Sequence, residues 1–164
     1  MTAHNLISAL FLFLLSLLVS PIYADTKSTA PWGHAETLDI KYPPHKVIYD
    51  LTTGDLKELD FTLSRISYLN SLYGADPFES SIIVVIHEKA LEHFAIENLS
   101  DNKQLMERAR NLTIGSTIEF RMCKVSTKFK GYEPKDIHGF VQMVPMADAE
   151  IIRLQLEEGY AYIK

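Results

Sequence analysis

The sequence predicts an α/β protein: a three-layer α/β/α sandwich with a mainly parallel sheet of about five strands. Short runs of apolar and β-branched residues alternate along 46–164 with stretches whose apolar residues recur at helical spacing. Strands that are separated by helices need crossover connections, which give parallel strands and place helices on both faces of the sheet. The order of the strands cannot be derived from this pattern.

The first two strands and the helix between them have clear boundaries. The sequence KVIYDL at 46–51 predicts a strand, because three of its apolar residues are consecutive. Asp55 stands three residues before Glu58, which is the spacing of a capping box, and Gly74 is placed to end the helix that starts there. The uninterrupted run at 81–86 predicts a strand that is buried on both faces.

The middle of the chain predicts two helices and a third strand. The apolar spacing at 91–95 indicates a short helix after the second strand. Asp101 is placed to cap a longer helix, whose apolar residues share one face until Gly115 ends it. At 118–122 apolar residues alternate with polar ones, which predicts a strand with one less apolar face.

The end of the chain predicts the remaining elements. We expect one or two helical turns at 124–130, a fourth strand at 140–144 and a short fifth strand at 160–163. Gly159 is placed to end a helix before the fifth strand. The apolar face of that helix comprises Ala147, Ile151 and Leu154.

The N-terminal part of the chain predicts export. Residues 1–24 contain no Asp, Glu, Lys or Arg, and the apolar run at 6–19 is shorter than the ~20 residues that span a bilayer. Such a run is typical of a secretory signal peptide, here cleaved after Ala24, with a retained anchor as the alternative. We therefore expect a signal peptide at 1–24, a linker or N-terminal arm at 25–45 and a domain at 46–164, in a periplasmic or secreted protein.

Charge and motif content narrow the classes of partner and cofactor. The 16 basic and 21 acidic residues give a net charge of −5, which argues against a nucleic-acid partner. The chain has no phosphate-binding glycine loop, no GxSxG elbow and no Cys-His cluster with metal spacing, so we expect no cofactor and no metal. After removal of the signal peptide, no segment predicts contact with a membrane.

Cys123 is the candidate catalytic residue. It is the only cysteine, so it cannot form an internal disulfide, and it lies at the carboxyl end of the third strand, where sites of parallel sheets form. Arg121, Lys124 and Lys128 belong to a basic segment at 121–130 that contains no acid. Positive charge and a helix that starts near Lys124 both favour the thiolate. A buried structural cysteine explains this position equally well.

His87 is a candidate supporting residue. It stands at the carboxyl end of the second strand, where a site residue is expected. The alternative is a capping or solvated histidine. Asp50 and Asp55 flank the first loop and could act as acids, but capping explains Asp55 more simply.

Four sequence segments together resemble a known family. They are KVIYDL, IIVVIH, IEFRMC with a short helix after it, and the closing sequence EIIRLQLEEGYAYIK. With these segments the domain resembles the DsrE/DsrF-like family of small sulfur-relay proteins, in its exported single-domain branch. The resemblance implies an α/β sandwich that assembles into homotrimers or homohexamers. It also implies that Cys123 carries sulfur as a persulfide between donor and acceptor proteins.

The expected function is therefore sulfur relay in an exported compartment, with Cys123 as the acceptor. Whether the protein has sulfurtransferase-like enzymatic activity is left open by the sequence. Two other functions stay open as well. One is a non-catalytic module of the same fold that binds a ligand or a partner protein, and the other is a redox-sensing thiol that forms intermolecular disulfides.

Overall fold

The structure is a computed structural model that describes residues 30 and 32–164. The expected signal peptide at 1–24 lies outside the described residues, as does the beginning of the expected arm. The chain divides into two compact units, one that ends at Asp39 and one at Ile40–Lys164. In the first unit, residue 30 and residues 32–39 form no helix or strand. Across the described residues, no helix combines the length and apolar character needed to cross a membrane.

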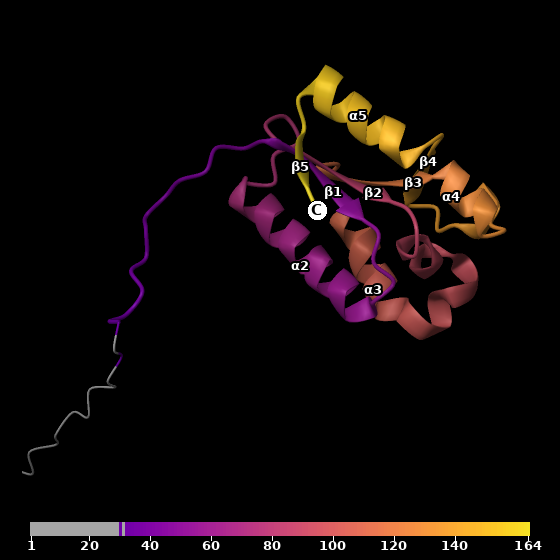
Figure 1. Cartoon of the computed structure of the whole chain (residues 1–164), viewed down its shortest axis with the longest axis horizontal. Helices are drawn as coiled ribbons and strands as arrows, with labels where there is room; N and C mark the ends of the chain where they lie inside the picture. The colour runs from indigo at the N-terminus through magenta and orange to yellow at the C-terminus, as the bar shows by residue number, and fades with distance from the viewer. Residues whose placement is uncertain (1–29, 31) are drawn as a thin grey trace, which may run out of the picture. The chain divides into compact units, whose positions relative to one another are not determined.

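The second unit contains a five-stranded parallel sheet, which confirms the predicted fold class (Figure 1). Its order is β4-β3-β2-β1-β5, and each pair of neighbours is parallel. The chain therefore adds strands outward from β1 to β4 and returns to the other side of β1 with β5. The strands are β1 (Lys46–Leu51), β2 (Ser81–Ile86), β3 (Ile118–Cys123), β4 (Val141–Val144) and β5 (Ala161–Ile163).

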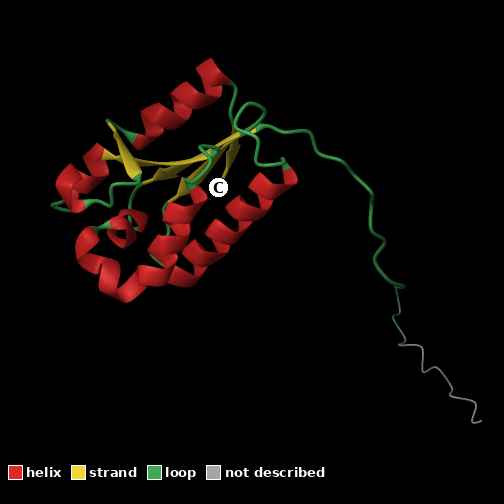
Figure 2. Cartoon of the chain, turned by 180° about the vertical axis from the view of Figure 1, so that it is seen from behind, coloured by secondary structure: helices red, strands yellow, loops and turns green. Residues whose placement is uncertain are grey.

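Helices cover both faces of the sheet (Figures 1 and 2). The long helices α2 (Leu56–Leu72) and α3 (Leu99–Leu112) pack on one face. The other face carries α5 (Ala147–Glu158), with the short α4 (Lys124–Phe129) beside the start of α5. Short 3-10 helices complete the unit: η2 (Ala90–Phe94), η3 (Ile96–Asn98) and η4 (Pro134–Asp136).

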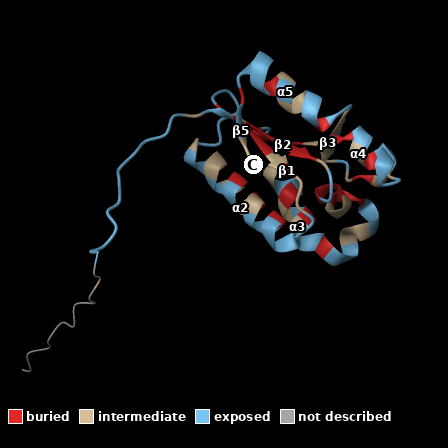
Figure 3. Cartoon of the chain, viewed as in Figure 1, coloured by how far each residue is buried: buried red, intermediate tan, exposed pale blue. Residues whose placement is uncertain are grey.

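The core has two parts because successive residues of a strand point to opposite faces. The larger part lies under α2 and α3 and contains Val47 of β1, Val84 of β2 and Phe120 of β3. The smaller part lies under α5 and contains Ile48, Ile83 and Val85 with Cys123, Ala147, Leu154 and Tyr160. Figure 3 shows buried residues concentrated in the central strands, which agrees with the continuous apolar sequence of β2.

The start of α2 confirms the predicted cap. The Asp55 carboxylate accepts hydrogen bonds from the N–H groups of Lys57 (2.7 Å) and Glu58 (3.0 Å). The second bond of the capping box, from the N–H of Asp55 to the Glu58 carboxylate, is made through Thr53. The Thr53 hydroxyl accepts from the N–H of Asp55 and donates to Glu58. These bonds satisfy N–H groups that a helix start otherwise leaves without partners.

The predicted cap at Asp101 is wrong. Helix α3 begins at Leu99 with Asn98 as its N-cap residue, so Asp101 lies in its first turn. The backbone is non-helical at Asn102, whose side-chain amide donates to the carbonyl of His93 at 2.7 Å. This tertiary hydrogen bond explains the kink, which helical spacing in the sequence does not indicate.

The last two strands begin one residue later than predicted, and in both cases a turn explains the difference. The N–H of Val141 donates to the carbonyl of His138, so Phe140 belongs to the turn before β4. The N–H of Tyr160 donates to the carbonyl of Leu154 across Gly159, whose φ of 74° is in the left-handed region. Tyr160 therefore completes the helix end instead of pairing in β5.

Candidate functional site

The candidate site lies where the carboxyl ends of β1, β2 and β3 meet. The register pairs Leu51 with Ile86 and Ile86 with Met122, so the three strands end side by side. Cys123 is the last residue of β3 and the N-cap residue of α4. Its side chain faces α5 and is buried, with 3% of the residue exposed.

Hydrogen-bond donors surround the Cys123 sulfur. The N–H of Ser126 lies 3.4 Å from Sγ, and the Ser126 hydroxyl and the N–H groups of Val125 and Ala147 also donate to it. Burial raises the pKa of the thiol, but these hydrogen bonds together outweigh burial and lower the pKa below its ordinary value. The donors come from α4 and from the start of α5, so the fold itself favours the thiolate.

The three predicted basic residues have different surroundings. Lys124 and Lys128 are exposed on α4, and neither forms an ion pair within the described part of the chain. Arg121 is instead held by two carboxylates, with 2.7 Å to Glu119 and 2.5 Å to Glu150. Its charge is therefore compensated, and the donors that reach Sγ are N–H and O–H groups.

His87 belongs to a hydrogen-bonded chain that crosses three strands. Its Nε2 lies 2.6 Å from Oδ1 of Asp50 on β1, and the Tyr162 hydroxyl on β5 donates to Oδ2 of the same carboxylate. The side chains of His87 and Asp50 are only 14% and 11% exposed. The hydrogen bond to Asp50, with a smaller contribution from burial, raises the pKa of Tyr162 to about 12.

Sequence reasoning found two members of this chain and missed the third. His87 was predicted as a supporting residue and Asp50 was considered as an acid, whereas Tyr162 was assigned only to the last strand. The sequence signal that could have led to this chain was Asp50 itself, a carboxylate that directly follows the apolar residues 47–49 of β1. A buried carboxylate needs donors, and the sequence does not show which strand supplies them.

The raised pKa of Tyr162 is testable by titration. We expect a spectrophotometric titration of the native protein to contain a tyrosine that ionises near pH 12, and we expect Tyr162→Phe to remove that component. Because the pKa is raised on folding, the bond to Asp50 contributes its full stability below the unfolded value of 10.0 and loses it as the pH rises toward 12. An unchanged late component in Tyr162→Phe would contradict this assignment.

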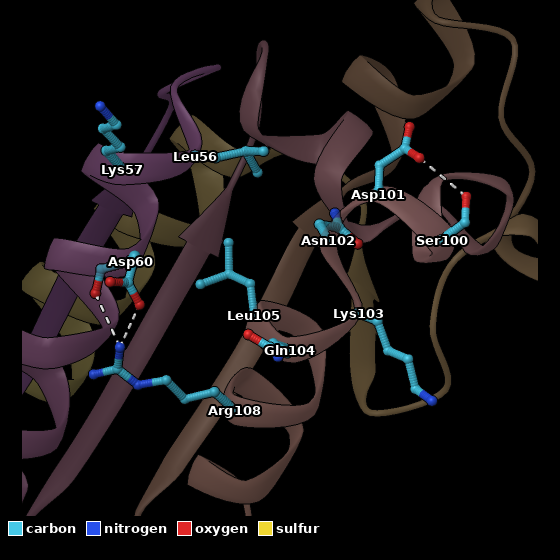
Figure 4. A pocket seen from close by; sticks show the side chains of 10 residues that line it. All are labelled: Leu56, Lys57, Asp60, Ser100, Asp101, Asn102, Lys103, Gln104, Leu105 and Arg108. Carbon is cyan, nitrogen blue, oxygen red and sulfur yellow. Dashed lines mark hydrogen bonds and ion pairs between the residues drawn. The ribbon is translucent and has the colours of Figure 1, made fainter.

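A separate depression lies between the starts of α2 and α3 (Figure 4). Its volume is about 800 Å³, and it is on the α2–α3 side of the sheet, so it shares no residue with the chain that contains His87. Several of its polar groups pair with one another, since Arg108 bonds Asp60, and Ser100 bonds Asp101. The structure does not place any predicted site residue there.

The described residues contain no group of three His, Cys, Asp or Glu side chains that could hold a metal ion. No known family profile matches the chain, and no curated protein does. Among solved structures, the chain is similar to the protein of unknown function MTH1491 from Methanobacterium thermoautotrophicum, at 20% identity and a TM-score of 0.58. The match covers 73% of this chain and 97% of that one. This likeness shows the α/β fold.

Proposed function

We propose that the protein carries sulfane sulfur as a persulfide on Cys123, in an exported compartment. The observation that carries the proposal is the set of donors on Sγ from Ser126, Val125 and Ala147, which lower the pKa of a thiol at the carboxyl edge of the sheet. The thiolate is the nucleophile in sulfur exchange, so donors that stabilise the anion increase the reactive fraction at neutral pH. The resemblance to sulfur-relay proteins supports the same chemistry.

The exchange itself needs only the cysteine and a donor. The Cys123 thiolate attacks the outer sulfur of a persulfide R–S–SH, a new S–S bond forms on Sγ, and the donor S–S bond breaks. The products are Cys123–S–SH and the thiolate RS⁻, and no external oxidant is needed. An acceptor thiolate then removes the outer sulfur by the same exchange.

A second candidate function is a binding module in which Cys123 is structural. It is favoured by the burial of Cys123, which leaves 3% of the residue exposed among Ile48, Val85 and Ala147. Under the first proposal, the cover formed by α4 and the start of α5 moves aside when a donor approaches. Under the second, it stays closed and the thiol does not react in the native protein.

The intact mass of the protein separates the two functions. Treatment of the native protein with thiosulfate or polysulfide is expected to add the mass of sulfur, and dithiothreitol is expected to remove it. Cys123→Ser should gain nothing. The absence of an adduct on the native protein, together with iodoacetamide labelling only after unfolding, would reject sulfur relay and support the binding module.

The proposal extends to partners and location. We propose a homotrimer or homohexamer in the periplasm or outside the cell, which receives sulfur from one protein and gives it to another. Exposed apolar residues on the outer sides of α4 and α5 support an assembly: Phe129, Ile152 and Leu156. A single monomeric species in sedimentation velocity would refute the assembly.

A further inference from the structure

The chain of Tyr162, Asp50 and His87 shares one face and one end of the sheet with Cys123. Ile48 faces α5, as Cys123 does, and Asp50 lies two residues further along β1. Side chains two residues apart on a strand point to the same face. Tyr162 pairs in register with Ile48 and therefore has the same orientation.

His87 is the member that comes nearest to Cys123 in the strand register. It follows β2 two residues after Val85, which also faces α5, and its N–H donates to the carbonyl of Leu51 at 3.1 Å, so the ladder with β1 continues to this point. Since Ile86 pairs with Met122, His87 and Cys123 occupy the next position of two neighbouring strands. Neighbouring strands lie about 4.8 Å apart.

The two ring nitrogens of His87 have different surroundings. Nε2 is bound to Asp50, and within the described residues neither a side chain nor Sγ of Cys123 hydrogen-bonds to Nδ1. Glu88 follows with a φ of 54°, a left-handed backbone that L residues rarely adopt, so the chain turns sharply directly after His87. Asp50 thus holds the imidazole at Nε2, and Nδ1 keeps its hydrogen-bonding capacity.

We infer that His87 is the general acid of sulfur transfer to Cys123, with Asp50 and Tyr162 as the residues that position it. The inference rests on the proposed function and names its donor class, an alkyl persulfide whose leaving group needs a proton. Asp50 fixes the tautomer and orientation of the imidazole, as carboxylates do for catalytic histidines, and Tyr162 holds the second oxygen of Asp50.

The proton balance distinguishes two kinds of donor. Attack on an alkyl persulfide expels RS⁻, a basic thiolate, to which protonated His87 gives its proton; the imidazole then regains a proton from solvent. Attack on thiosulfate expels sulfite, a weakly basic anion that can leave without a proton at neutral pH. General acid catalysis therefore accelerates the first reaction and contributes little to the second.

The test compares cysteine persulfide with thiosulfate as donors to His87→Gln. Glutamine keeps a donor for Asp50 but cannot transfer a proton. Loading of Cys123, followed by intact mass, is expected to slow about 100-fold with cysteine persulfide and to stay within about twofold of wild type with thiosulfate. Equal slowing with both donors, or no slowing with either, would overturn the inference.

Three further variants complete the test. His93→Gln changes a half-buried histidine that bonds the carbonyl of Gly54, and it should load from both donors like wild type. Asp50→Asn and Tyr162→Phe should slow the loading of Cys123 by smaller factors, and again only with cysteine persulfide as the donor. If His87→Gln does not fold, the donor selectivity of Tyr162→Phe decides, and the lack of any selectivity there would overturn the inference.

The outcomes separate this inference from the proposed function. Failure of the proposed function appears in the wild-type protein, which would load from neither donor. Failure of the inference appears only in the variants, with wild type loading normally and His87→Gln showing no preference between donors. Slower loading of His87→Gln from cysteine persulfide alone supports both the inference and the proposed function.

Discussion

Replacement of Phe120 with alanine is expected to lower the free energy of unfolding by about 3–5 kcal/mol. Phe120 is fully buried on β3, and its ring centroid lies 5.8 Å from those of both Phe94 and Phe140. The substitution removes most of a large apolar side chain and leaves a cavity that rigid neighbours fill only in part. Chemical denaturation followed by far-UV circular dichroism measures the loss in the free energy of unfolding.

Phe78→Ala is the matched control for this prediction. The same chemical change is made at a residue that is 97% exposed, so we expect a change within about 0.5 kcal/mol. Similar losses in the two variants would show that Phe120 does not occupy the core described above. Because β3 also carries Cys123, a fold weakened at Phe120 is expected to lose native protection of the thiol as well.

Much of the fold could be predicted from the sequence because the sheet has a simple physical pattern. The continuous apolar run of β2 reflects its central place, where both faces are covered. The order of the strands could not be predicted, since nothing local distinguishes a fifth strand beside β1 from one beside β4. The kink at Asn102 also has no local signal in the sequence, because a tertiary hydrogen bond to the carbonyl of His93 causes it.

The candidate site was only partly predictable. The positions of Cys123 and His87 at strand ends follow from the strand pattern. Tyr162 and Asp50 are 112 positions apart in sequence, and only the placement of β5 beside β1 brings them together. The sequence also indicated cations around the thiol, whereas the Ser126 hydroxyl and backbone N–H groups of α4 and α5 lower its pKa, and the backbone groups have no sequence signature.

The half-buried ion pairs of Arg121 lead to the second large effect. Arg121→Met is expected to destabilise the domain by about 3 kcal/mol at neutral pH, at the lower end of the effect of breaking buried pairs. The Arg121 side chain is 17% exposed and bridges Glu119 of its own strand and Glu150 of α5, so its loss leaves Glu119 without a bonded cation and Glu150 with one cation fewer. Glu119 is 34% exposed and Glu150 keeps Arg153, which moderates the cost.

The pKa of Glu150 determines how the stability lost in Arg121→Met changes with pH. Hydrogen bonds from Arg153 lower the pKa of Glu150; burial opposes them, and Arg121 lowers the pKa further. A carboxylate whose pKa is lowered on folding contributes stability above its unfolded value of 4.5 and loses it as the pH falls through the folded value. In Arg121→Met the pKa of Glu150 moves back toward 4.5, so less stability remains to be lost.

The difference between wild type and Arg121→Met should therefore be largest near pH 7 and shrink as the solution is acidified below the unfolded pKa of Glu150. Lys103→Met is the control, because it removes an exposed pair with Glu107 on α3 and should cost less than about 0.5 kcal/mol at any pH. Denaturation of the three proteins across this range tests both the size and the direction. A pH-independent penalty in Arg121→Met would mean that packing of its side chain, rather than its charge, holds α5 on the sheet.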